Sequence, residues 1–137
     1  MEVQPERAHA ILKGVTDTDA RRIGFNPQYA RPDWMVLTVL PIPPPHVRPS
    51  IQMGSDARGE DDLTIKLMDI VRANKALREH EKNGAPNHVQ LQTARLLQYH
   101  IATFVENSMP GQPAATTRSG RPLKSIAARL KSVRPPC

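Results

Sequence analysis

The residues of this chain that could do chemistry are its arginines and lysines, and the chemistry is phosphate binding. Residues 1–106 contain 13 Lys/Arg and 13 Asp/Glu, whereas residues 107–137 contain six Lys/Arg and no acid, so the net charge of +6 belongs to the final segment. A block of one sign attracts polyanions, with an affinity that falls as salt rises. A solvated basic tail with no partner explains the same charge equally well.

Seven cations lie in or directly after two segments rich in proline and glycine. These candidate nucleic-acid-binding residues are Arg48, Arg58, Arg118, Arg121, Lys124, Arg129 and Lys131. Arginine suits phosphate because its planar fork makes paired hydrogen bonds. Gly120 and Pro122 are expected to hold Arg121 in exposed, extended backbone. The plain alternative is that these side chains only keep the loops solvated.

Other chemistry finds little support in the sequence. The acidic run at residues 60–62 is explained by a helix start, whose dipole favours negative charge. The five histidines have no ligand spacing, and His88 and His100 are expected on polar faces. We find no nucleophile–base order, no GxGxxG motif and no phosphate-binding loop motif. Cys137 is the only cysteine, which excludes an intrachain disulfide and a thiolate zinc site. We therefore predict no catalytic, metal or cofactor site in this segment.

The elements that must position the cations are mainly helical. A chain of 137 residues suggests one domain at most. Residues 5–13 read as a short helix, and Thr16 followed by Asp19 resembles a capping box that opens a second one. Residues 34–42, WMVLTVLPI, predict a strand buried on both faces. Five prolines then indicate a long connection without regular structure over residues 43–59.

Residues 60–106 predict an antiparallel hairpin of two coiled-coil helices. The first seam is Leu63, Leu67, Ile70, Asn74 and Leu77, with Asn74 at a core position that can fix register. The second seam is Ala94, Leu97, Ile101 and Phe104. Asn83 and Gly84 end the first helix and Pro86 starts the second. Because the helices run antiparallel, the loops before and after the hairpin are expected to meet at its base. Residues 125–131 are helix-prone.

Several unusual words in the sequence carry a family resemblance. YARPDWM, VLPIPPPHVRPS, EDDLTIKLMDI and SGRPLKS occur in one order, and the likeness is nearly continuous from about Glu6 to Lys131. In these stretches the chain resembles the largest subunit of eukaryotic RNA polymerase II. By position the resemblance assigns residues 1–42 to the clamp core and residues 43–59 to the lid loop. It assigns residues 60–106 to the clamp coiled coil. Residues 107–131 correspond to the rudder loop and the start of the switch region, and residues 132–137 form a divergent tail.

The resemblance implies a role in DNA-templated transcription in the nucleus. In the family, lid and rudder guide template DNA, the RNA–DNA hybrid and the transcript, and the coiled coil docks initiation and elongation factors. The implied partners are therefore DNA, the hybrid, other polymerase subunits and transcription factors. We expect no membrane partner, because no apolar run reaches the roughly 18 residues of a membrane span and the N-terminus has no apolar signal region.

The departures from the family pattern set the limits of this expectation. The family's zinc-binding segment and its Asp-rich loop for the catalytic magnesium have no counterpart here, so we expect a fragment of a polymerase subunit that is inactive alone. After Lys131 the family continues with GKEGR, where this chain has SVRPPC. Two alternatives stay open: a stand-alone helical-hairpin adaptor that binds proteins and has a basic tail, and a small basic RNA-binding protein.

Overall fold

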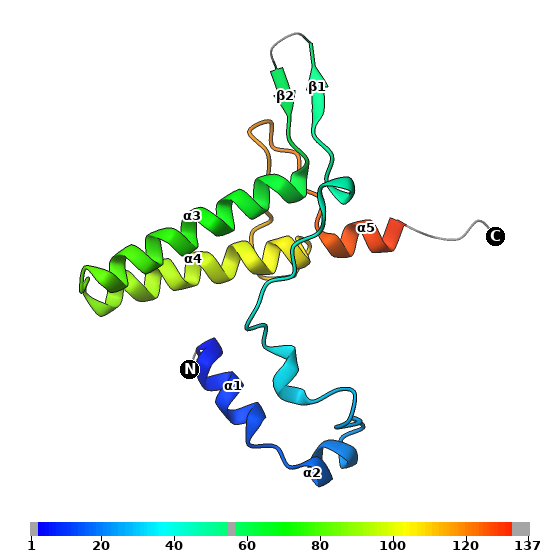
Figure 1. The fold of residues 1–137 in the computed structure, drawn as a ribbon, viewed down its shortest axis with the longest axis vertical. Coiled ribbons are helices and arrows are strands. Elements are labelled where there is room, and N and C mark those ends of the chain that lie inside the picture. Colours follow the sequence, from blue (N-terminus) through cyan, green and yellow to red (C-terminus); the bar gives the residue numbers. More distant parts are fainter. Residues whose placement is uncertain (1–2, 55–56, 133–137) are drawn as a thin grey trace, which may run out of the picture. The chain divides into compact units, whose positions relative to one another are not determined.

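The computed structural model describes residues 3–54 and 57–132. The chain divides into two compact units, Met1–Ile42 and Pro43–Cys137. Figure 1 traces the order of the elements, which are mainly helical as predicted. Most of the divergent end predicted at 132–137, residues 133–137 with Cys137, lies outside the described residues.

The first unit begins with the two predicted helices, α1 (Pro5–Lys13) and α2 (Asp17–Arg22). The predicted cap of α2 is confirmed: the Asp19 amide donates to Thr16 Oγ1 at 3.2 Å. Arg31 then ties the unit together, because its guanidinium pairs with Asp17 and Asp33 and donates to the Val15 carbonyl at 3.2 Å. The sequence reading gave no role to Arg31.

The strand predicted at residues 34–42 is wrong. A short 3₁₀ helix, Pro32–Met35, occupies its start, and the residues after it pair with no strand among the described residues. Trp34 and Val39 are 55% and 78% exposed. A strand needs the backbone of a neighbour for its hydrogen bonds, and an apolar, β-branched composition cannot supply that neighbour.

The connection at residues 43–59 contains more structure than predicted. A 3₁₀ turn spans Pro45–Val47, and β1 (Ile51–Met53) pairs antiparallel with β2 (Ala57–Gly59). The expectation of an irregular segment is therefore wrong for this hairpin. The prolines end at Pro49 and so leave the backbone amides of residues 51–59 free to form the ladder.

The helical hairpin of the second unit is confirmed. It consists of α3 (Asp62–Lys82) and α4 (Asn87–Val105), which pack side by side (Figure 1). Asp61 caps α3 by accepting from the Leu63 amide at 3.1 Å. Gly84, with a positive φ of 62°, closes the turn between the helices. Residues 125–131 are confirmed as helix-prone, since α5 spans Ile126–Ser132.

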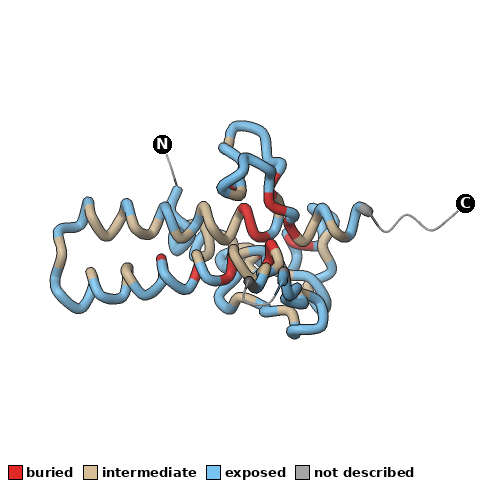
Figure 2. The backbone as a smooth tube through the Cα atoms, turned by 90° about the horizontal axis from the view of Figure 1, so that it is seen from above, coloured by how far each residue is buried: buried red, intermediate tan, exposed pale blue. Residues whose placement is uncertain are grey.

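The core of the hairpin lies at its base, the end away from the interhelical turn (Figure 2). Phe104 and Leu63 are each 1% exposed there. The seam predicted on α3 is correct up to Ile70 but wrong at Asn74, which is exposed while Ala73 is buried. Ala73 and Asn74 lie three and four residues after Ile70, so both border it on the helix surface. The apolar residue of the two is the one that is buried.

A lysine is buried at this base. Lys66 of α3 is 2% exposed, and its Nζ lies 3.0 Å from His100 Nδ1 of α4 and 5.3 Å from the ring centre of Tyr99. His100 is therefore half-buried in the hairpin interface, and its predicted place on a polar face is wrong. Burial, followed by the charge of Lys66, lowers the pKa of His100 despite the opposing effect of Asp69.

Acidification is expected to destabilise the hairpin through His100. The unfolded chain binds a proton at its ordinary pKa of about 6.5, whereas the folded chain resists protonation because the pKa is lowered. Stability is thus lost as pH falls from about 6.5 towards the folded-state pKa. Thermal midpoints followed by circular dichroism between pH 7.5 and 5 measure this loss. His100→Gln keeps an acceptor for Lys66 and should flatten the dependence of the thermal midpoint on pH. His88 is exposed, so the control His88→Gln should leave this dependence unchanged. An equal pH dependence in the two variants would contradict the role of His100.

Candidate nucleic-acid interface

The two basic segments meet at the base of the helical hairpin. β2 ends at Gly59, directly before α3, and the loop of residues 106–125 leaves the end of α4 at the same end of the hairpin (Figure 1). An open hollow of about 350 Å³ lies between them, lined by the ends of β1 and β2, the start of α3, and Arg121, Lys124 and Arg129. The predicted meeting of the flanking loops is thus confirmed.

Asn107 closes the stem of the second loop. Its Nδ2 donates to the carbonyls of Ala115 and Leu123, both at 2.9 Å, and its Oδ1 accepts from the Ala115 amide at 2.7 Å. The Leu123 amide also donates to the Ala115 carbonyl at 2.9 Å. Asn107, Ala115 and Leu123 are all buried. One amide side chain therefore satisfies the backbone of both strands of the stem.

Arg118 lies at the tip of this loop. The Thr117 amide donates to the Arg121 carbonyl at 2.8 Å, and the Gly120 amide donates to the Thr117 carbonyl at 3.0 Å. Gly120 has a φ of 82°, the left-handed conformation that closes a three-residue hairpin connection. Thr116 and Pro122 form a bridge below the turn. The loop is thus a small ordered hairpin that presents Arg118 to solvent.

Asp62 fixes this loop to the helical hairpin. Its Oδ1 accepts from Arg121 Nη2 at 2.8 Å, and its Oδ2 accepts from the Lys124 backbone amide at 3.0 Å. Burial raises the pKa of Asp62, but the hydrogen bonds from Lys124 and Arg121 outweigh it and leave the pKa below its ordinary value. Asp62 is therefore an ionised, buried anchor at the start of α3, where the helix dipole also favours its charge.

Arg129 and Arg48 fix the first basic segment. Arg129 Nη1 donates to the Val47 carbonyl at 3.0 Å, and its Nη2 pairs with Asp61. Arg48 Nη1 donates to Thr64 Oγ1 of α3 at 3.3 Å. These contacts join the residues before β1 to α3 and α5. Both arginines thereby stabilise contacts between elements of the second unit.

Lys131 is paired as well. Its Nζ lies 3.0 Å from Glu106 Oε2. A hydrogen bond from Ser108 and the contact with Lys131 lower the pKa of Glu106 to about 2. This pair joins α5 to the residue that follows α4.

The seven predicted cations thus divide into two groups. Arg48, Arg121, Arg129 and Lys131 make the contacts just described. Arg58, Arg118 and Lys124 have exposed side chains, with no side-chain hydrogen bond or ion pair to another described residue. Because pairing uses the donors of the first group, the second group is the better placed to meet phosphate.

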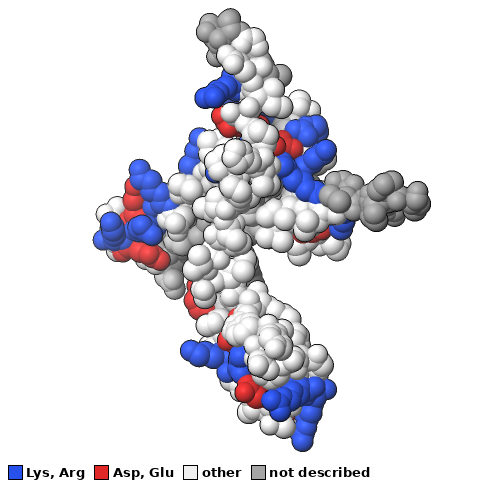
Figure 3. Space-filling model, turned by 45° about the vertical axis from the view of Figure 1, so that its right-hand side comes forward, with Lys and Arg blue, Asp and Glu red and all other residues white. Residues whose placement is uncertain are grey.

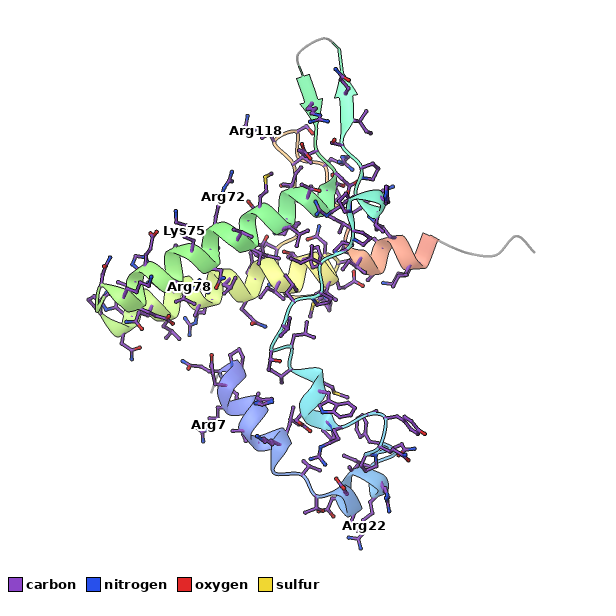
Figure 4. The ribbon with its side chains drawn as sticks, in the orientation of Figure 1. Arg7, Arg22, Arg72, Lys75, Arg78 and Arg118 are labelled. Carbon is purple, nitrogen blue, oxygen red and sulfur yellow. The ribbon has the colours of Figure 1, made fainter. Side chains whose placement is uncertain are left out.

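Further cations on α3 were missed by the sequence reading. Arg72, Lys75 and Arg78 are exposed, and their spacing of three residues places them on neighbouring positions of the helix surface. In Figure 4, Arg72 and Lys75 point away from α4, on the side of α3 where the loop with Arg118 rises. Within each of the two units, Figure 3 shows the blue atoms of Lys and Arg in clusters with red carboxylates beside them, so neither unit shows a continuous basic surface in this view.

No group of three or more His, Cys, Asp and Glu that could hold a metal lies in residues 3–54 and 57–132. Within the same described ranges no helix combines the length and apolarity needed to cross a membrane.

The fold and the site define a helical hairpin that carries two cation-bearing β-hairpin loops at its base. The family model described as RNA polymerase Rpb1, domain 1, matches residues 1–132. The chain belongs to this family, that of the largest subunit of RNA polymerase. Its role is accordingly in DNA-directed transcription, as part of a nucleotidyltransferase complex that associates with DNA and other polymerase subunits.

Proposed function

We propose that this chain guides nucleic acid in the clamp of RNA polymerase II in the nucleus. Residues 1–42 form part of the clamp core, residues 43–59 act as a lid, and residues 107–131 act as a rudder and lead towards the switch region. The observation that carries the proposal is that Arg58, Arg118 and Lys124 lie exposed on two loops anchored at one end of a helical hairpin.

The mechanism is electrostatic positioning. Exposed guanidinium and ammonium groups contact phosphates and hold the strands of an RNA–DNA hybrid without reading bases. The paired cations hold the two loops in place, so the free ones are presented from a fixed framework. No cofactor is assigned to this segment, and no catalytic step is assigned to its residues.

Salt dependence tests the proposal. Replacing Arg58, Arg118 and Lys124 together by alanine is expected to weaken binding of the full chain to an RNA–DNA hybrid. It should also reduce the slope of log K against log salt by roughly two to three, at about 0.7–0.9 per phosphate contact. Fluorescence anisotropy between 50 and 300 mM salt measures both quantities.

A matched control removes the same charge elsewhere. Arg7, Arg21 and Arg22 are exposed residues of the first unit, and their triple alanine variant loses the same three charges. Its slope should stay close to that of the unmodified chain. Equal losses in the two variants would mean that net charge alone drives binding, and the interface assignment would fail.

We propose in addition that the helical hairpin docks transcription factors. Its buried residues on α3 stop at Ala73, so the half nearest the interhelical turn keeps most of its side chains accessible. A stand-alone adaptor with a basic tail is the competing function. Removal of residues 107–137 separates the two: an adaptor would keep its protein partner and lose nothing in function, whereas a clamp segment would lose hybrid binding.

A further inference from the structure

The second loop is held by a carboxylate that opposes its function electrostatically. Asp62 is buried beside Arg121 and Lys124, two cations of the proposed interface. A negative charge at this place repels phosphate. Its presence in an interface for polyanions therefore calls for a role other than binding.

The contacts of Asp62 supply that role. One carboxylate oxygen accepts a hydrogen bond from the side chain of Arg121, and the other accepts one from the backbone amide of Lys124. Both oxygens of Asp62 therefore bind the second strand of the loop hairpin. Asn107 holds the same strand one residue earlier, through the Leu123 carbonyl. The loop is thus attached to α3 by Asp62 and to the end of α4 by Asn107. The bridge of Thr116 with Pro122 lies between these attachments and the tip, which carries Arg118.

We infer that Asp62 is a positioning residue for the nucleic-acid interface: it sets the loop so that Arg118 and the side chain of Lys124 face the polyanion, and this outweighs its own repulsion. The inference rests on the proposed function. It assigns to Asp62 no contact with nucleic acid.

The sign of a mutational effect tests the inference. Asp62→Ala and Glu60→Ala each remove one carboxylate at the start of α3, and Glu60 makes no hydrogen bond to the loop among the described contacts. Electrostatics alone predicts that both variants bind an RNA–DNA hybrid more tightly. Positioning predicts that Glu60→Ala binds equally or up to about twofold more tightly, whereas Asp62→Ala binds roughly threefold to tenfold more weakly because the loop must be ordered on binding.

A conservative variant and a second readout complete the design. Asp62→Asn keeps an acceptor for the Lys124 amide and should recover part of the lost affinity. Hydrogen exchange of the Lys124 amide should accelerate in Asp62→Ala and less in Asp62→Asn, with helix content unchanged by circular dichroism. If Asp62→Ala loses helix content, the affinities of Asp62→Asn and Glu60→Gln for the RNA–DNA hybrid are compared instead. Asp62→Asn is expected to bind the hybrid more weakly than Glu60→Gln.

The outcomes separate the inference from the function beneath it. If the unmodified chain binds the hybrid and Asp62→Ala binds as tightly as Glu60→Ala, the positioning role is refuted and the proposed function stands. If the unmodified chain shows no salt-dependent binding to the hybrid, the proposed function fails. In that case exchange at Lys124 still reports whether Asp62 holds the loop.

Discussion

Phe104→Ala is expected to lower the free energy of unfolding of the second unit by about 3–5 kcal/mol. The Phe104 side chain is 1% exposed and lies with Leu63 in the small core at the base of the helical hairpin. Truncation removes buried apolar surface and leaves a cavity, and both changes favour the unfolded state. Because small domains are stable by only about 5–15 kcal/mol, most of the helical signal should be lost at low urea. Urea denaturation followed by circular dichroism measures the change.

The same helix offers a control. Leu96 of α4 is 49% exposed, so Leu96→Ala removes a comparable apolar group that is already half in water. Its cost should be about 1 kcal/mol or less. Similar midpoints for the two variants would show that the core at the base does not hold the hairpin together.

Asn107→Ala is expected to release the second loop while the helices stay formed. The Ala115 amide and the Leu123 carbonyl lose their partner in the buried stem, while the Ala115 carbonyl keeps its bond from the Leu123 amide. An unsatisfied buried polar group costs about 1–3 kcal/mol, so the stem should open by local unfolding. Amide exchange at Ala115 should accelerate on the order of tenfold or more, since about 1.4 kcal/mol corresponds to a factor of ten.

Asn74→Ala is the control for this effect. Asn74 is exposed on α3, and alanine has the higher helix propensity, so its stability should be unchanged or slightly raised. The stability of Asn74→Ala also tests the predicted coiled-coil seam of α3. If Asn74 were buried in the seam and fixed its register, its replacement would change the free energy of unfolding strongly in one direction or the other. Unchanged exchange at Ala115 in Asn107→Ala would contradict the role of Asn107 as the closure of the stem.

The helices were predictable because their signals are local. Thr16 with Asp19, the acidic start of α3, and Asn83 with Gly84 lie within a few residues of the ends they define. The apolar stripe of α3 and α4 also follows from sequence spacing, and two such stripes joined by a short turn pair antiparallel. The one error on α3, at Asn74, arose because Ala73 and Asn74 both border Ile70 on the helix surface, and spacing alone does not decide which of them is buried.

The strands were not predictable, because pairing is a property of two segments. Residues 34–42 have a strand's composition but no paired neighbour in the described chain. Residues 51–53 and 57–59 have no marked strand composition, yet they pair because a short connection brings them together. Asn107 was missed for the same reason, since a lone asparagine after a helix shows nothing of the two carbonyls it will meet.

The sequence by itself determined the helical hairpin, the meeting of both basic segments at its base, and the excess of positive charge after Glu106. Only the tertiary structure decided which cations remain available. Arg121 pairs with Asp62, which lies 59 residues away in the chain, and Arg129 pairs with Asp61, 68 residues away. Charges act through distance in space, so a cation's pairing is fixed only once the fold has brought the two segments together. Of the seven predicted cations, Arg58, Arg118 and Lys124 are exposed and make no side-chain hydrogen bond or ion pair to another described residue, so they are available to a partner.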